Sequence, residues 1–360
     1  MITLEELETD PHPILARLRP LGWVPVLNGW LVTGREAALE VLRDDETFTV
    51  DDPRFSTGQV VGPSMLSRDG AEHVRHREPF AEALRLAAVR ERFAPFVGGE
   101  VDRLLDDIEH DGRAELRRSV AGPLAARNVA ELLGIEAADT SSMLGWYDAI
   151  VASVTGVAAG REPTVDGAAA FDTLSRTVSP LLAPAPALTG DEVVSNAAVM
   201  MFGGIETTEG MIVNLVYHLL LHGVGDPSLS PNALEESLRL EPAAALVDRY
   251  ATRDVALAGA SIRKGDFVEV SLAGANRDPA FFPDPDRFDV DRENARHHLA
   301  FAQGPHVCVG MHLARLEAQI AAERLFARLP GLRLDPGRPT APRGLVFRKV
   351  PRLDVLWERR

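Results

Sequence analysis

Helical periodicity dominates the pattern of apolar and polar positions along the chain. Apolar residues recur at i, i+3 and i+4 with charged residues between them, which is typical of amphipathic helices that bury one face. This pattern predicts helices over residues 37–43, 71–86, 93–108, 124–133, 193–222 and 311–329. Thr189 and Gly190 form a breaker before the fifth of these helices, and Asp191 is its expected N-cap.

Strand-like segments are few and short. Residues 24–26 and 30–33 flank Leu27-Asn28-Gly29 and predict a hairpin with an Asn-Gly turn. Two further short strands are predicted over residues 255–257 and 267–271, beside turn signals at Gly259 and Gly265. We therefore expect a mainly α fold with a minor β sheet.

Pro-rich runs at residues 180–186 and 279–285 are interpreted as connectors and not as linkers between domains. No internal repeat and no low-complexity tail interrupts the pattern. We expect one domain over residues 1–360.

Composition and charge exclude some classes of function. Hydrophobic residues make up 46% and charged residues 25%, as in ordinary globular proteins. The net charge of -15 argues against nucleic acid or an anionic membrane surface as the main partner. The acidic N-terminus lacks the features of a signal peptide, and the apolar run 211–221 is interrupted by Asn214 and His218. We expect a cytoplasmic protein.

The chain contains one cysteine, Cys308. A single cysteine excludes disulfides within the chain and zinc or iron–sulfur sites built from several cysteines. A buried core thiol, a catalytic nucleophile and a single thiolate ligand remain open at this point.

The residues around Cys308 favour the thiolate ligand. Phe301-Ala302-Gln303-Gly304-Pro305-His306-Val307-Cys308-Val309-Gly310 comes directly before the predicted helix over 311–329. The thiol therefore lies at a helix N-terminus, where free N–H groups and the helix dipole stabilise a thiolate. Gly310 lets a flat ligand or another helix approach closely, and Phe301 is expected to shield the sulfur from water.

This segment resembles the cysteine signature of the cytochrome P450 family, Phe-x-x-Gly-x-His-x-Cys-x-Gly. The resemblance implies a P450 fold, with haem b between the oxygen-side helix and the cysteine-loop helix, and Cys308 as the axial ligand of the haem iron. The family usually has Gly where this chain has Ala302, a departure expected to stiffen the loop. A cysteine hydrolase is the competing interpretation, but His306 is poorly spaced to serve as its base.

The predicted helix over 193–222 contains Gly203-Gly204-Ile205-Glu206-Thr207-Thr208. Two adjacent glycines in mid-helix cost stability, so the segment indicates a local opening of the helix or a packing groove. It looks like the P450 oxygen-activation motif. On that resemblance Gly203 and Gly204 lie against the distal haem face, Thr207 hydrogen-bonds the oxygen and Glu206 relays protons from solvent.

Charged residues elsewhere match P450 patterns as well. His73 and Arg77 are i and i+4 on one helix, so they share a face. The resemblance implies that these two residues, together with Arg249 and His306, bind the haem propionates. It also implies a structural ion network of Glu236 and Arg239, three residues apart, with Arg287 as third partner; Arg292 is the less favoured candidate.

The predicted activity is insertion of one oxygen atom from O2 into a small apolar or aromatic substrate, in secondary metabolism. Apolar segments that usually line the P450 substrate pocket are residues 60–66, 243–247 and 345–347. Because the chain has no flavin or iron–sulfur module, electrons are expected from a separate ferredoxin and ferredoxin reductase. Arginines between Arg68 and Arg92 give a weak indication of the docking face. Oxidative coupling, epoxidation or ring formation, and a non-catalytic haem sensor, remain as alternatives.

Overall fold

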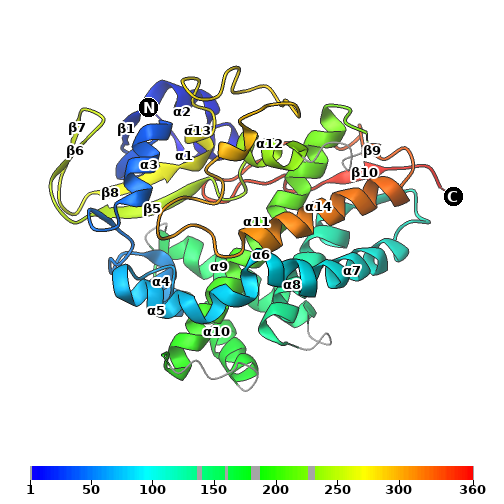
Figure 1. Cartoon of the computed structure of the whole chain (residues 1–360), viewed down its shortest axis with the longest axis horizontal. Helices are drawn as coiled ribbons and strands as arrows, with labels where there is room; N and C mark the ends of the chain where they lie inside the picture. Colours follow the sequence, from blue (N-terminus) through cyan, green and yellow to red (C-terminus); the bar gives the residue numbers. More distant parts are fainter. Residues whose placement is uncertain (1, 136–139, 159–160, 180–186, 226–231, 360) are drawn as a thin grey trace.

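The computed structural model describes residues 2–135, 140–158, 161–179, 187–225 and 232–359 (Figure 1). Helices make up most of the described residues, and the strands form small sheets, which confirms the expected mainly α fold. The helices are α1 (Leu4–Thr9), α2 (His12–Leu18), α3 (Arg35–Arg43), α4 (Ser56–Val61), α5 (Gly70–Ala81), α6 (Leu86–Ala88), α7 (Ala94–Asp106), α8 (Gly122–Leu133), α9 (Thr140–Ala158), α10 (Val165–Val178), α11 (Gly190–Leu221), α12 (Asn232–Leu240), α13 (Leu272–Ala275) and α14 (Met311–Arg328).

The strands form three separate sheets. The largest has the order β1-β2-β8-β5-β3, a second has the order β4-β10-β9, and β6 pairs with β7. Within the largest sheet only β2 and β8 run parallel. The strands are β1 (Leu21–Val24), β2 (Gly29–Val32), β3 (Phe48–Thr49), β4 (Arg113–Glu115), β5 (Leu246–Ala251), β6 (Val255–Leu257), β7 (Ala260–Ile262), β8 (Phe267–Ser271), β9 (Arg333–Leu334) and β10 (Asp354–Leu356).

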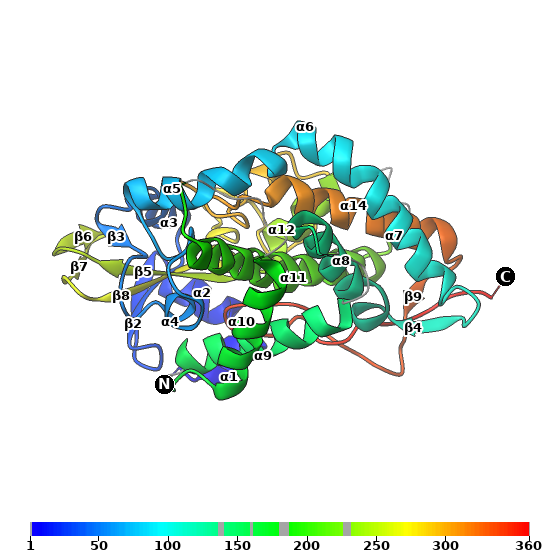
Figure 2. The ribbon, with the colours of Figure 1, turned by 90° about the horizontal axis from the view of Figure 1, so that it is seen from below.

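The long helix α11 forms the centre of the helical part and is buried over most of its 32 residues. It packs against α8, α12 and α14. Helices α5, α6 and α7 lie on the same side of α11 as α14, and α9 and α10 lie on the opposite side (Figure 2). The apolar face of α11 is continuous with the main core because its neighbours cover it on nearly every side.

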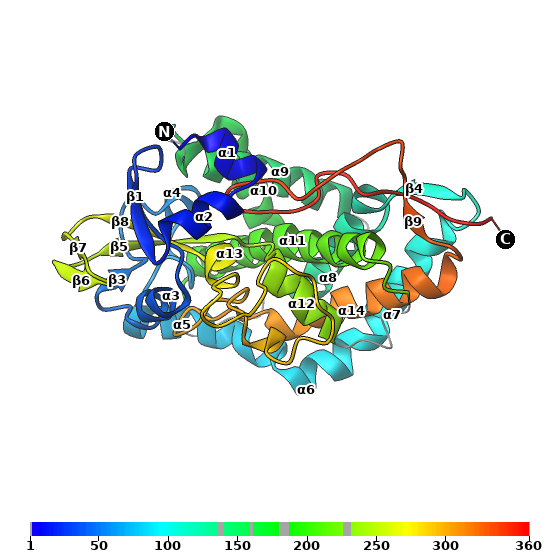
Figure 3. The same cartoon turned by 90° about the horizontal axis from the view of Figure 1, so that it is seen from above.

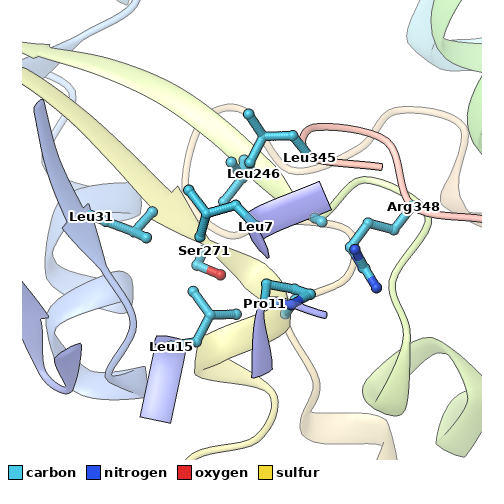
Figure 4. A pocket seen from close by; sticks show the side chains of 10 residues that line it. Leu7, Pro11, Leu15, Leu31, Leu246, Ser271, Leu345 and Arg348 are labelled. Carbon is cyan, nitrogen blue, oxygen red and sulfur yellow. The ribbon is translucent and has the colours of Figure 1, made fainter. Parts of the chain in front are cut away.

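The two faces of the largest sheet are covered by different helices. Val32, Val268 and Val270 pack in one cluster with α3, while Leu31 packs in another with α1 and α2. Between α1, α2 and the sheet lies a small cavity, with Leu7, Pro11 and Ser271 in its wall (Figure 4). It holds no more than about one water molecule, so it is not a substrate site.

The C-terminal segment returns from β9 towards the N-terminal helices (Figure 3). The N–H of Gly344 donates to the carbonyl of Glu8 at 2.9 Å, and the Arg348 guanidinium donates to the same carbonyl at 3.0 Å. The segment around Gly344 and Arg348 is therefore tied to α1, whereas the chain then runs back through β10 to a C-terminus far from the N-terminus (Figure 3).

Most predicted helices are present with ends shifted by a few residues. The largest difference is the helix predicted over 71–86, which ends at Ala81 as α5, two residues after Pro79. The N-cap of α11 was predicted wrongly. Thr189, not Asp191, caps the helix: its hydroxyl accepts from the N–H of Glu192, and the Glu192 carboxylate accepts from the N–H of Thr189.

The strand predictions differ mainly in the first hairpin. Its strands are β1 and β2, so the connection covers residues 25–28 and is longer than predicted, with Asn28 in the left-handed region at φ +49°. The strands over 255–257 and 267–271 are confirmed. The Pro-rich run 180–186 lies outside the described residues, as do residues 226–231.

Candidate active site

Cys308 lies in a loop that is folded tightly against α3 and runs into α14. The N–H of Cys308 donates to the carbonyl of Phe301 at 2.9 Å and closes the loop on itself. Ala302 and Gly304 both adopt left-handed backbone, at φ +58° and +74°. A β-carbon on Gly304 would clash with the carbonyl oxygen of Leu42, so only glycine fits there. At Ala302, where the P450 signature has glycine, an alanine carries the strain instead.

Some features around the Cys308 sulfur disfavour the thiolate, and others favour it. Burial by the surrounding chain raises the pKa of the Cys308 thiol, although the side chain remains accessible to solvent. The Gly310 N–H and the positive charges of Arg77 and Arg315 lower the same pKa, but burial prevails. The expected stabilisation at the helix N-terminus is therefore present and insufficient alone; a bound metal cation would supply the remaining preference for thiolate.

Phe301 covers one side of the loop and is held by a cation. The Arg315 guanidinium lies over the Phe301 ring at 4.4 Å from its centroid. Arg315 is fixed in turn by the Glu235 carboxylate at 2.8 Å. This chain of contacts joins α12 and α14 to the aromatic residue next to the cysteine.

The glycines of α11 face different surroundings. No atom lies within 4 Å of a β-carbon built on Gly203, whereas one built on Gly204 would lie 2.6 Å from Cγ2 of Val129 on α8. Gly204 therefore allows close packing of α8 and α11, and the placement of both glycines against the distal haem face stays a prediction. The space beside Gly203 is not filled by side chains of the other described residues.

Thr207 stands one helical turn after Gly203. Its hydroxyl donates to the Gly203 carbonyl at 2.5 Å, and α11 continues through this point without a break. The predicted opening of the helix is thus limited to this side-chain hydrogen bond. The neighbouring Thr208 is buried.

Glu206 forms an ion pair that the sequence did not indicate. Its carboxylate lies 2.7 Å from Nζ of Lys349, and the same ammonium lies 2.6 Å from the carboxylate of Glu209. Arg117 contacts Glu209 at 2.9 Å. Lys349 comes from the C-terminal segment, far from α11 in sequence, so no local pattern could reveal the contact.

The predicted propionate ligands gather around one buried point. The rings of His73 and His306 are 4.2 Å apart, and His306 Nε2 lies 2.6 Å from Asp69. The Arg77 guanidinium donates to the carbonyl of Val307 at 2.6 Å, and that of Arg249 donates to the carbonyl of Asp248 at 2.7 Å. In the described part of the chain, neither arginine forms an ion pair with a carboxylate within 4.0 Å.

Three of these groups, His73, Arg77 and Arg249, form no ion pair with a carboxylate among the described residues, whereas His306 pairs with Asp69. Nε2 of His73 is buried without a hydrogen-bond partner among the described residues. Burial, His306 and Arg77 lower the pKa of His73 to about 4. Burial likewise lowers the pKa of Arg249, which is only 4% exposed. A buried cluster of donors and cations is stable only beside negative charge, so the site fits a ligand with carboxylates.

Comparison with known proteins decides the family. The cytochrome P450 family model matches residues 228–336. The cytochrome P450 monooxygenase PikC of Streptomyces venezuelae is 35% identical over 99% of this chain and 93% of its own length. The mycinamicin IV hydroxylase/epoxidase of Micromonospora griseorubida is 33% identical over 97% and 93%. This chain is a cytochrome P450.

Solved P450 structures agree. P450BioI, crystallised with an acyl carrier protein that bears hexadec-9Z-enoic acid, superposes with a TM-score of 0.85 at 28% identity, covering 98% of this chain and all of that one. The P450 CxnD, which forms a C–S bond in chuangxinmycin biosynthesis, has a TM-score of 0.87 at 29% identity and covers 99% and 97%. As a member of the family, the protein is a monooxygenase with haem b as its cofactor.

The side chains of this P450 fit a haem. The Nε2 of His73, which has no hydrogen-bond partner among the described residues, and the cations Arg77 and Arg249, which donate there to backbone carbonyls, suit its propionates. The open space beside Gly203 suits a flat ring next to α11. No neighbour lies within 4 Å of a β-carbon on Gly310 either, so the described protein atoms leave that position open. Among the described residues, no helix is long and apolar enough to span a membrane.

The ion network that supports the cysteine loop differs from the prediction in its third member. Arg239 contacts the Glu236 carboxylate at 2.7 Å in a fully buried pair. Arg292, not Arg287, is the third partner, with its guanidinium 3.1 Å from Glu236. The Arg287 side chain is 69% exposed, and only its backbone carbonyl joins the network. The loop folds back at Asp289, which turns Arg292 inward.

Proposed function

We propose that this P450 inserts one oxygen atom from O2 into a small, largely apolar organic substrate of secondary metabolism. Two electrons from a separate ferredoxin and its reductase, together with two protons, reduce the other oxygen atom to water. The observation that carries this proposal is the intact pair of Glu206 and Thr207 beside the open space at Gly203. Such a pair is what proton delivery to O2 requires.

The haem supplies the redox-active iron at which O2 is activated. Cys308 would hold the iron through its sulfur, and Phe301 lies in the same loop, where the Cys308 N–H donates to its carbonyl. His73, Arg77, Arg249 and His306 would hold the propionates, and Asp69 orients His306 through the 2.6 Å contact. These donors come from three separate parts of the chain, α5, β5 and the cysteine loop.

Thr207 and Glu206 move protons. The Thr207 hydroxyl keeps one proton at Oγ1, in a hydrogen bond to the Gly203 carbonyl that can be exchanged for one to the substrate side. Glu206, the residue before Thr207 on α11, restores that proton from solvent. A hydroxyl that donates and accepts, backed by an acid, forms a short relay.

The substrate is proposed to be apolar because the neighbouring walls are. Phe347 packs edge-on against Phe202 of α11 with ring centroids 5.3 Å apart. Phe347 also pairs through its backbone with Ala244, which brings the predicted segments 243–247 and 345–347 together. In the third predicted segment, residues 60–66, Val60 and Val61 belong to α4.

Electron transfer is proposed to use the exposed arginines near the cysteine side. Arg68, Arg75 and Arg92 are already paired with Asp51, Glu192 and Glu131. Arg85 and Arg90 are exposed and flank Leu86, whose side chain is 43% exposed. This smaller area suits an acidic ferredoxin, since two cations beside an apolar residue give both steering and contact.

A second reaction of the same class is oxidative bond formation. It is favoured by the likeness to CxnD, which forms a C–S bond. The same proton relay would serve it, because activation of O2 precedes either outcome. Product analysis separates the two: hydroxylation adds one oxygen atom, whereas coupling removes two hydrogens.

The test begins with the carbon monoxide difference spectrum of the reduced holoprotein, with Cys308→Ser as control. We expect the red-shifted Soret band of a thiolate ligand, and its loss in the variant. A substrate panel follows, taken from the names of relatives: 6-deoxyerythronolide B, mycinamicin IV and vitamin D3. Each compound is titrated for its spin-state shift and then turned over with ferredoxin and reductase. No thiolate band in the wild-type protein would overturn the proposal.

A further inference from the structure

We propose that Lys349 is a positioning residue for Glu206 and connects occupancy of the substrate pocket to proton supply. The inference rests on the proposed role of Glu206. The Lys349 ammonium lies between two acids, 2.7 Å from Glu206 and 2.6 Å from Glu209. Because Glu206 and Glu209 are three residues apart on α11, they share one face and can compete for the same cation.

The two acids are not equally dependent on Lys349. Glu209 also contacts Arg117 at 2.9 Å, whereas Glu206 pairs with Lys349 alone among the described residues. The side chains of Glu206 and Lys349 are each 11% exposed, and that of Glu209 is 3% exposed, so water screens the contacts poorly. A small movement of the ammonium towards Glu209 would therefore release the Glu206 carboxylate for proton exchange.

The choice of lysine at this position is unusual for the chain. Of its 38 lysine and arginine residues only Lys264 and Lys349 are lysines. An arginine between the two acids would bind both with its planar fork and hold them in place. The compact ammonium of lysine can shift from one carboxylate to the other without losing a fixed geometry.

The C-terminal segment links Lys349 to the pocket. Phe347 and Lys349 are two residues apart in an extended stretch, so their side chains point to the same side. Phe347 packs on Phe202, and Lys349 contacts Glu206, one helical turn further along α11. A β-carbon on Gly210 would lie only 3.4 Å from Cβ of Lys349, so the segment lies close against the helix. A substrate that displaces Phe347 would thus move Lys349 along the face that carries both acids.

The first test observes the lysines directly. Wild-type holoprotein labelled with 13Cε-lysine gives two side-chain signals, because the chain has two lysines. The panel compound with the largest spin-state shift is then added to saturation. We expect the Lys349 signal, assigned with Lys264→Met, to shift while that of Lys264 stays in place. An unmoved Lys349 signal would overturn the link to the pocket.

The second test measures coupling. In Lys349→Met we expect several-fold more hydrogen peroxide per product, with the dissociation constant of the same panel compound unchanged. Lys264→Met, on an exposed turn, is the matched control and should behave as wild type. If Lys349→Met does not fold, Lys349→Arg keeps the positive charge, and we expect the same loss of coupling because its fork holds both acids. Wild-type coupling in the folded variant would overturn the role of Lys349.

Failure of this inference is distinguishable from failure of the proposed function. If Glu206→Gln uncouples the enzyme while Lys349→Met does not, only the role of Lys349 is wrong. If Glu206→Gln itself leaves coupling unchanged, the proposed role of Glu206 is wrong, and the inference about Lys349 falls with it.

Discussion

The carboxylate of Glu236 is shared by two buried arginines, of which Arg292 contacts it at 3.1 Å from a loop 56 residues away. Arg292 also donates to the carbonyls of Pro283 at 2.6 Å and Asp284 at 3.0 Å. One guanidinium thus fixes the path of the loop that precedes the cysteine segment, and both charges are hidden from water.

Arg292→Met should destabilise the protein by about 3 kcal/mol or more, because it leaves loop carbonyls and half of a buried ion cluster without a partner. Arg287→Met should change the free energy of unfolding by less than about 0.5 kcal/mol, since its side chain is exposed. Urea denaturation of both holoproteins measures the difference. Equal effects of the two substitutions would mean that the network does not depend on Arg292.

Local sequence determines much of the site, and the contacts that it missed are those between distant segments. The cysteine loop, the glycines of α11 and the spacing of His73 and Arg77 are patterns within a few residues of one another. Lys349 meets Glu206 across 143 positions of the sequence, so only the folded path of the C-terminal segment reveals their contact. The choice between Arg287 and Arg292 likewise depends on an irregular loop whose turn at Asp289 no periodicity predicts.

The cysteine loop should become more stable when its strain is removed. Ala302 has φ +58°, a conformation that costs a residue with a β-carbon about 1 kcal/mol relative to glycine. Ala302→Gly should therefore raise the free energy of unfolding by about 1 kcal/mol, less the entropy that glycine gains in the unfolded chain.

Gly304→Ala is the opposing control for the same loop. Its left-handed backbone and the clash with the Leu42 carbonyl should together cost about 2 kcal/mol or more. Thermal denaturation of both variants checks the pair. A stabilising Gly304→Ala would show that the loop is not pressed against α3.

Adjacent glycines in α11 should respond in opposite ways to alanine. Gly204→Ala places a methyl group 2.6 Å from Val129 and should destabilise the packing of α8 and α11 by about 1 to 3 kcal/mol. Gly203→Ala meets no protein atom and should stabilise the helix by about 1 kcal/mol. The added methyl group would occupy the open space beside Gly203. Gly203→Ala should therefore also weaken the binding of panel compounds. Denaturation curves and spin-state titrations of both variants separate stability from binding.

Glu317 should make stability depend on pH. It is buried on α14 with 3% exposure, and burial raises its pKa to about 8, an effect that Asn128 of α8 reduces. The folded state therefore holds a proton that the unfolded chain, with an ordinary pKa of 4.5, has already lost at neutral pH. Its contribution is complete below about pH 4.5 and is lost as the pH rises towards 8.

Glu317→Gln removes this dependence, because the amide does not titrate. Between pH 5 and pH 8 the wild type should lose on the order of a few kcal/mol relative to the variant. Urea denaturation of both proteins at several pH values gives the difference directly. Parallel curves would mean that Glu317 is ionised in the folded state.

Thr207→Ala should uncouple electron consumption from product formation. The Thr207 hydroxyl is the donor that the proposed relay offers, and its removal leaves Glu206 without a carrier at the pocket. We expect several-fold more peroxide per product, with little change in the binding of panel compounds, since only a small polar group is lost.

Thr207→Ser keeps the hydroxyl and should retain most of the coupling. Thr208→Ala removes a buried neighbouring hydroxyl that is not part of the relay and should leave coupling as in wild type. Equal coupling in Thr207→Ala and Thr208→Ala would remove Thr207 from the relay while leaving the haem ligand and the fold untouched.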